Sequence, residues 1–455
     1  MCAFTGAFGD PRRAEAMSRL YGSIVNLSSV VVRKVGVDRA GEISAHRALS
    51  SPRVTPAETL DCLARATTRA VAGRRIVVAQ DTTEVNFAGR QSRGLGPAGQ
   101  RDTRRSEPAP GFFIHAAVAI DAQTDSVLGL AHAEIWTRDP APPPARRERA
   151  LADKESQRWL SAAQIASERL SAAAQVIVVG DRESDIYALF SRCPDGVELV
   201  VRSGQNRVLD NGARLFEAAS GWPVLGLREV QVASRGPGDR GRVAMVVLKA
   251  GTLTLKHPRN GRRDGDPHSL GVTLVEAVET NAPPGATPLH WRLLTTLAAT
   301  HESDAAEIVR LYRLRWRIEQ SFRMLKTHGL QIEDAQTADP HRLFNLAALA
   351  TGAAVRIIQL VDARDGSKRP AADVATAPQI AAASALCRKL EGKTDRQRNH
   401  HPAGSLAWMS WIVARLGGWN CYYKPPGPKT MRDGWHRFAA IAEGFALASS
   451  TEQVV

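Results

Sequence analysis

The chain has 455 residues, of which 44% are hydrophobic, and 60 Lys and Arg against 46 Asp and Glu give a formal charge of +14. This hydrophobic share excludes wholesale disorder and allows about two or three domains, and the positive charge favours a polyanionic partner such as nucleic acid. The five cysteines are scattered without metal-ligand spacing, which argues against a structural zinc site or a disulfide framework. Because there is neither a signal segment nor a run of roughly 18 apolar residues, we expect no membrane association and a cytoplasmic location.

The N-terminal part of the chain predicts helices followed by strands. Helices are expected in residues 1–70, because a capping side chain precedes a proline at two positions, Asp10-Pro11 and Thr55-Pro56. An apolar run from 75 to 81 then predicts a buried strand that ends at the carboxylate of Asp81. Two further apolar runs predict a hairpin, with strands at 111–120 and 126–136.

A second buried strand, 175–181, also ends at a carboxylate, Asp181. It follows a predicted helix at 153–170 and precedes a strand that ends at Arg202. From about 204 to 290, Gly and Pro turns separate short alternating segments, which indicates a β-rich insertion. The elements expected beyond it are a strand at 290–296, one helix from about 304 through 326, a largely helical C-terminal part and a linker at 370–377.

One predicted helix carries an unusual set of polar residues. On a continuous helix with about 100° per residue, one face carries Tyr312, Arg315, Glu319 and Lys326, with Arg323 beside them. Apolar residues occupy the adjoining flank: Leu311, Leu314, Ile318, Phe322 and Leu325. A carboxylate among cations suits metal-assisted chemistry on a nucleic-acid backbone. The alternative is a surface helix on which Glu319 merely pairs with Arg315 or Arg323.

Three carboxylates therefore stand out: Asp81, Asp181 and Glu319. If the two strands are adjacent and parallel, both Asp side chains lie at one edge of the sheet, and a packed helix could add Glu319. Converging carboxylates repel one another unless divalent cations such as Mg²⁺ or Mn²⁺ bind them. The alternative for each Asp alone is a strand-end or helix-capping residue.

These residues resemble the motifs of the bacterial cut-and-paste DDE transposases of the insertion-sequence-four group. Asp81-Thr82-Thr83 is similar to the first family motif, and Asp181-Arg182-Glu183-Ser184-Asp185 to the start of the second. The helix reproduces the spacing Y-x(2)-R-x(3)-E-x(6)-K with Tyr312, Arg315, Glu319 and Lys326. Further similarity covers nearly the whole chain, although the chain begins closer to Asp10-Pro11 than family members do, so we expect altered recognition of transposon ends.

The resemblance implies an α/β fold: a ribonuclease-H-like catalytic core at 71–330, interrupted by the β-rich insertion and flanked by helical domains at 1–70 and 331–455. It implies that Asp81, Asp181 and Glu319 hold two Mg²⁺ ions, which Mn²⁺ can replace. The activity it implies is nicking of the transposon end, hairpin formation by the freed 3′-hydroxyl, and joining to target DNA.

The resemblance also assigns DNA contacts. Trp291 matches the position that stacks an extruded base, and an indole does offer a sequence-tolerant stacking surface. The remaining implied contacts are cationic or phenolic side chains that hold phosphate: Tyr312, Arg315, Lys326, Arg202 and Arg323. The alternatives are a core aromatic for Trp291 and a solvated charge for Arg202.

The partners implied by the family are double-stranded DNA, as terminal inverted repeats and target, and a second copy of the chain in the synaptic complex. The helical domain at 1–70 is expected to bind the transposon end, and that at 331–455 to dimerise. Two other functions stay open at this stage. One is a transposase-derived regulator that binds ends without cleaving them, and the other is a structure-specific nuclease on the same fold.

Overall fold

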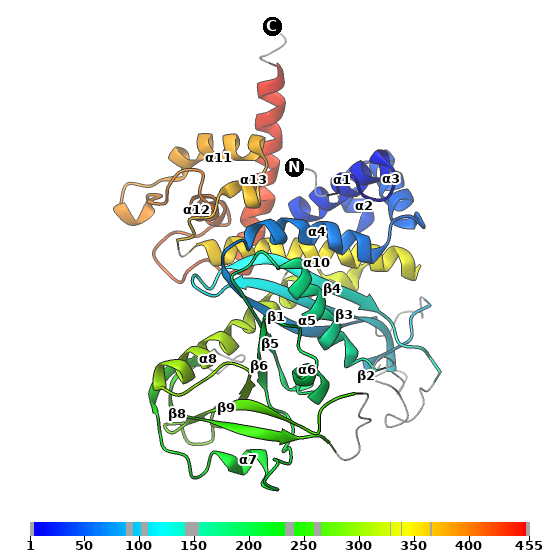
Figure 1. Cartoon of the computed structure of the whole chain (residues 1–455). Helices are drawn as coiled ribbons and strands as arrows, with labels where there is room; N and C mark the ends of the chain where they lie inside the picture. Colours follow the sequence, from blue (N-terminus) through cyan, green and yellow to red (C-terminus); the bar gives the residue numbers. More distant parts are fainter. Residues whose placement is uncertain are drawn as a thin grey trace. The chain divides into compact units, whose positions relative to one another are not determined.

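A computed structural model describes residues 4–87, 94–101, 108–141, 154–232, 241–258, 265–327, 329–337, 339–364 and 366–451. The chain forms two compact units (Figure 1). The first unit combines Met1–Ala72, Thr82–Ala141 and Arg317–Val455, and the second combines Gly73–Asp81 and Pro142–Trp316. Neither unit is one continuous stretch of sequence.

The first unit begins with helices, as predicted: α1 (Pro11–Leu27), α2 (Val32–Val35), α3 (Arg39–Ser50) and α4 (Pro56–Ala70). Both predicted start signals are confirmed. The Asp10 carboxylate accepts a hydrogen bond from the N–H of Arg12, and the Thr55 hydroxyl accepts one from the N–H of Glu58. These caps satisfy backbone donors that have no partner inside the helix.

The predicted hairpin of the first unit is confirmed and longer than expected. Strands β3 (Pro108–Asp121) and β4 (Val127–Trp136) pair antiparallel, starting from Phe113 opposite Trp136. A short strand that was not predicted, β2 (Pro97–Arg101), pairs with β3. Its sequence, with Pro and Gly and no apolar alternation, carries no strand pattern.

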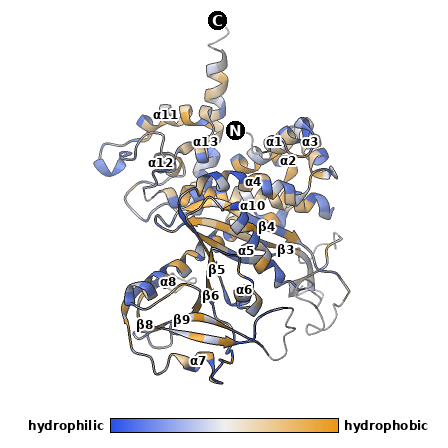
Figure 2. Cartoon of the chain, in the orientation of Figure 1, coloured by the Kyte–Doolittle hydropathy of each residue, from blue (hydrophilic) through white to orange (hydrophobic). Residues whose placement is uncertain are grey.

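Helix α10 (Pro340–Ala363) forms the core of the first unit. It packs against α1, α3, α4 and β4 and against two C-terminal helices, α12 (Leu406–Leu416) and α13 (Pro428–Thr451). Figure 1 shows α4 and α10 side by side, and Figure 2 shows the hydrophobic residues along α10. By length and composition α10 is apolar enough to cross a membrane, but 89% of its most apolar window is buried within the protein. It packs as a core helix.

The predicted linker at 370–377 is instead part of the packed first unit. A 3₁₀ turn, Ala371–Asp373, buries Ala371 and is followed by the buried Val374, before α11 (Ala377–Leu390) begins. The N–H of Ala371 donates to the carbonyl of Gly404 at 2.8 Å. The Pro- and Ala-rich composition suggested a linker, but apolar side chains three residues apart lie on one face of a 3₁₀ turn and can be buried together.

The second unit is built on a large sheet. Its strands follow the order β1 (Arg75–Asn86, up to Asp81 in this unit), β5 (Gln175–Gly180), β6 (Val197–Arg202), β10 (His290–Thr295), β9 (Ser269–Glu279), β8 (Arg242–Lys256) and β7 (Gly226–Val232). Strands β1, β5 and β6 are parallel, and each later pairing is antiparallel. Strands β7, β8 and β9 confirm a β-rich segment between 204 and 290.

The helices of the second unit are α5 (Gln157–Arg169), α6 (Tyr187–Ser191), α7 (Leu215–Ala218) and α8 (Glu302–Leu314). Helix α8 contacts β5, β6, β8 and β9. An ion pair fixes it to the first strand, since Nη1 of Arg75 lies 2.5 Å from Oε1 of Glu307. Parallel central strands with helices and an antiparallel extension make a mixed α/β fold, in agreement with the predicted class.

The single helix predicted for 304–326 is wrong. The structure contains α8 and a separate helix, α9 (Trp316–Leu325), with Arg315 between them. At this point the N–H of Arg315 bonds to the carbonyl of Tyr312, three residues back, which tightens the turn and interrupts the α-helical ladder. The polar arc from Tyr312 to Lys326 therefore spans two helices. The apolar flank is confirmed, because all five of its residues are buried.

Candidate active site

The two aspartates that end the predicted strands come together in the second unit. Strands β1 and β5 are adjacent and parallel, and their register pairs Ala79 with Val179. Asp81 and Asp181 each lie two residues beyond this pair, so both side chains face the same side of the sheet as the paired residues. The predicted adjacency of the two strands is thus confirmed.

Asp81 forms an ion pair with the residue that separates the two helices. Oδ2 of Asp81 lies 2.9 Å from Nη1 of Arg315, and both side chains are mostly buried, at 16% and 14% exposure. An arginine therefore stands beside the first candidate metal ligand. This contact joins Arg315 to a strand 234 residues away in sequence.

Asp181 caps a tight turn directly after β5. Its Oδ1 accepts a hydrogen bond from the N–H of Glu183 at 2.9 Å, and its carbonyl accepts one from the hydroxyl of Ser184 at 2.6 Å. The preceding residue must be glycine, because a Cβ on Gly180 would lie 2.2 Å from Oγ of Ser184. The Gly-Asp sequence at the strand end thus has a steric reason as well as a chemical one.

A buried ion pair fixes the loop that follows this turn. Asp185 is completely buried, and its carboxylate accepts from Nε and Nη2 of Arg207 at 2.9 and 2.7 Å. The same carboxylate accepts from the backbone N–H groups of Gly204 and Gln205 and from the hydroxyl of Ser203. Asp185 therefore connects the turn after Asp181 to the loop after β6.

Trp291 and Tyr312 form an aromatic pair in the second unit. Their ring centroids are 5.4 Å apart with an edge-to-face angle of 67°. Tyr312 is buried at 5% exposure, whereas Trp291 is only partly buried. Trp291 is thus not a fully buried core residue, and its indole is held by a neighbour in a geometry that aromatic pairs favour.

The strand that carries Trp291 is fixed on both sides. Arg202 on β6 pairs with Leu293 on β10 and donates to the carbonyl of His290 at 3.4 Å. On the other neighbour, β9, Glu276 accepts from Nε of Arg292 at 3.0 Å. These contacts hold the residues before and after Trp291, so the position of the indole is set by the sheet and not by a loop.

Three predicted site residues belong to the first unit: Glu319, Arg323 and Lys326 on and after α9. Glu319 is partly buried and Arg323 is exposed. Nζ of Lys326 donates to the carbonyl of Glu84 at 2.6 Å and lies 3.7 Å from the carboxylate of Glu333. Sequence reasoning missed these partners of Lys326, because one is a backbone carbonyl far away in sequence and the other lies beyond the end of α9.

The donors in the second unit fit part of a site for a hard cation. Carboxylate oxygens are the ligands that Mg²⁺ and Mn²⁺ prefer. Among the described residues, Oδ1 of Asp181 accepts a hydrogen bond while its Oδ2 accepts none. Across all the residues that the structure describes, no three His, Cys, Asp or Glu side chains lie close enough together to hold a metal ion. The structure thus brings together the two aspartates, and Glu319 lies in the other unit.

Comparison with known families bears on this arrangement. Residues 154–356 match the family model described as a transposase DDE domain. This match supports a DDE transposase. The family implies a nuclease and transposition enzyme that acts on DNA. The matched segment contains Asp181, Trp291 and the whole stretch from Tyr312 to Lys326, whereas Asp81 precedes it.

Proposed function

We propose that this protein is a cut-and-paste DDE transposase of the bacterial insertion-sequence-four group, similar to the enzyme of transposon Tn-five. The observation that carries the proposal is the placement of Asp81 and Asp181 in matching register at adjacent parallel strands, the second of them inside the matched transposase segment. The substrate is double-stranded DNA that carries the element's terminal inverted repeats, and target DNA is the acceptor. The reaction takes place in the bacterial cytoplasm.

The proposed catalytic residues and metal ligands are Asp81, Asp181 and Glu319. Two bound Mg²⁺ ions would activate water or a 3′-hydroxyl and stabilise the leaving oxygen at phosphorus. The support for Asp81 and Asp181 is the shared register and the chemistry of their oxygens, and for Glu319 it is the motif spacing. A ribonuclease-H-like domain at 71–330 would contain this centre, between a DNA-end-binding domain at 1–70 and a dimerisation domain at 331–455.

The proposed DNA contacts divide into phosphate-binding and stacking groups. Arg315 already lies 2.9 Å from Asp81, so a phosphate bound at Asp81 would be within reach of its guanidinium. Trp291 is partly exposed on a fixed strand, which suits an indole that stacks on an extruded base. The remaining contacts proposed are Tyr312, Lys326, Arg202 and Arg323. With a base out of the stack, the freed 3′-hydroxyl can attack the opposite strand and form a hairpin.

The experiment that tests this function is Mg²⁺-dependent cleavage of DNA carrying the element's own ends, with the parent protein and with Glu319→Gln. We expect hairpin-ended products from the parent and a loss of at least about a hundredfold in the variant, because the amide is a poor ligand for a hard cation. A suitable control is Glu168→Gln, which makes the same change at an exposed position of α5.

The outcomes separate the competing functions. Binding to the ends without cleavage by the parent would indicate a transposase-derived regulator. Cleavage that ignores the terminal sequence would indicate a structure-specific nuclease. Equal cleavage by the parent and Glu319→Gln would contradict the proposed active site.

A further inference from the structure

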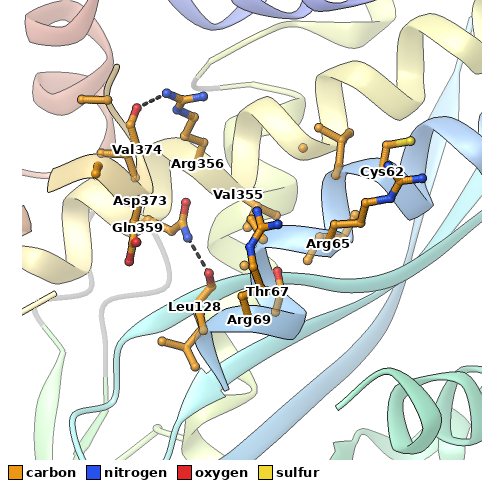
Figure 3. A pocket seen from close by; sticks show the side chains of 18 of the residues that line it. Cys62, Arg65, Thr67, Arg69, Leu128, Val355, Arg356, Gln359, Asp373 and Val374 are labelled. Atoms are coloured by element: carbon orange, nitrogen blue, oxygen red, sulfur yellow. Dashed lines mark hydrogen bonds between the residues drawn. The ribbon is translucent and has the colours of Figure 1, made fainter. Parts of the chain in front are cut away.

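The first unit contains a pocket that the proposed reaction does not use. Its volume is about 540 Å³, and its walls come from α4, β4, α10 and the segment from Arg369 to Thr376. Figure 3 shows Arg65, Arg69 and Arg356 among the side chains that line it. None of the proposed metal ligands or DNA contacts lines this pocket.

The lining of this pocket is strongly cationic. Four arginines contribute to it, Arg65, Arg69, Arg356 and Arg369, against one carboxylate, Asp373. That carboxylate is used by Arg369, since Nε of Arg369 donates to Oδ2 of Asp373 at 2.8 Å. The positive charges of the other three guanidinium groups have no carboxylate in the lining to offset them.

The partners of these arginines are neutral. Nη2 of Arg356 donates to the carbonyl of Val374, and Nη1 of Arg65 donates to the carbonyl of Thr5 at 3.2 Å. Nε of Arg356 is buried and has no hydrogen-bond partner among the described residues. Among the same described residues, Arg69 forms neither a hydrogen bond nor an ion pair. Backbone carbonyls fix a guanidinium without cancelling its charge, so the pocket keeps donors and positive potential for an anion.

Tyr21, beside Arg356, does not supply a negative charge. Burial raises the pKa of its phenol, and the nearby Arg356 lowers it only in part, so the hydroxyl stays neutral at physiological pH. The pocket also has apolar walls, which include Leu63, Leu130 and Val355. A cavity with cationic donors at some positions and apolar surface at others suits a ligand that carries both an anionic group and an apolar body.

We propose that this pocket binds a small phosphate ester of about mononucleotide size. Guanidinium groups match phosphate oxygens in charge and geometry, and the volume lies in the range of small-ligand sites, about 300–1,000 Å³. The free ester is favoured over the DNA backbone because the arginines line a concave pocket and not an extended groove. Arg65 and Arg69, one helical turn apart on α4, hold the phosphate together with Arg356.

Calorimetric titration of the full chain with AMP, ATP and inorganic pyrophosphate tests this proposal. We expect saturable binding by the parent, about tenfold weaker binding by Arg69→Ala, and a further loss of affinity in Arg65→Ala/Arg69→Ala. Each substitution deletes a guanidinium group and with it a charged hydrogen bond to the phosphate. Arg69 is exposed and has no partner among the described residues, so its removal should leave the fold intact, which circular dichroism would check. Arg53→Ala removes an exposed arginine outside the pocket and should bind like the parent.

Three results would overturn the proposal. These are no binding of any of the three probes at about 1 mM, binding that the double variant leaves unchanged, and displacement of the bound probes by duplex DNA carrying the ends. The readout does not depend on cleavage. Glu319→Gln should therefore bind the probes like the parent, which would separate this site from the active site.

Discussion

At the scale of single residues, the buried carboxylate of Asp185 has the clearest structural role near the candidate active site. It accepts hydrogen bonds from a guanidinium, two backbone N–H groups and a hydroxyl, and its partner Arg207 is itself only 6% exposed. A carboxylate with this many donors holds the turn after Asp181 and the loop after β6 in one arrangement. Asp185 therefore acts on the site by positioning backbone.

We predict that Asp185→Ala lowers the free energy of unfolding by about 3–5 kcal/mol, because it leaves the Arg207 charge buried without a partner. Urea denaturation followed by circular dichroism measures this change. Asp195→Ala, at an exposed position two residues before β6 begins, should change stability by less than about 0.5 kcal/mol. Equal effects of the two substitutions would contradict the role assigned to Asp185.

The residues of the candidate site were predictable from sequence to different degrees. Asp81 and Asp181 were found because each ends an apolar run, and a parallel pairing of these runs was the simplest way to bring them together. The Arg315 contact with Asp81 was not predictable, since it depends on where a helix end lies relative to a strand 234 residues away. The donors around Asp185 come from a loop whose sequence has no periodic pattern.

At the scale of elements, the contact between α12 and α13 depends on a glycine. A Cβ at Gly434 on α13 would lie 1.8 Å from the carbonyl oxygen of Val413 on α12. Because this obstacle is backbone, a side-chain rotation cannot remove it, and the two helices would have to separate. The close packing of these helices is therefore set by a single hydrogen atom in place of a side chain.

Gly434→Ala should lower the free energy of unfolding by roughly 1–3 kcal/mol, as expected for overpacking. Gly444→Ala is the matched control, because it lies on the same helix and a Cβ there meets nothing within 4 Å. That control should raise stability by up to about 1 kcal/mol, since Ala favours the helix over Gly. Thermal unfolding of the two variants beside the parent gives the comparison, and a stabilising effect of Gly434→Ala would rule out the close contact.

Most elements were predictable because each has a strong local pattern, and the errors have local causes too. The helix break at Arg315 leaves no signal in sequence, since neither Gly nor Pro is present and the apolar spacing continues through it. Strand β2 forms by pairing with β3 and not by its own propensity. In both cases a tertiary contact outweighs the local preference of the chain.

At the scale of the whole molecule, the proposed dimer has a candidate surface on α13. Ile441 and Phe445 are one helical turn apart and remain 41% and 38% exposed. An apolar pair at this spacing on one helix face is typical of a surface that packs against another helix. The proposed synaptic complex would cover it with the same helix of a second chain.

Replacing both residues, Ile441→Lys and Phe445→Lys together, should convert the DNA-bound dimer to a monomer, because lysines cannot be buried in an apolar contact without a partner. Sedimentation of the protein with end-bearing DNA measures the state. Glu443→Lys adds the same two units of charge on the opposite face of α13 and should leave the dimer intact. A dimer that survives the double substitution would place the interface elsewhere.

The division of the chain into two units has a consequence for synthesis on the ribosome. Most of the second unit, Pro142–Trp316, interrupts the first, which resumes at Arg317, and the core helix α10 of the first unit lies beyond that point. The second unit is complete before α10 has been synthesised. Until then, the apolar surfaces of the N-terminal helices and of the β3–β4 hairpin that pack against α10 stay uncovered. We expect products released before residue 340 to keep those surfaces exposed, and so to be removed by proteases or chaperones.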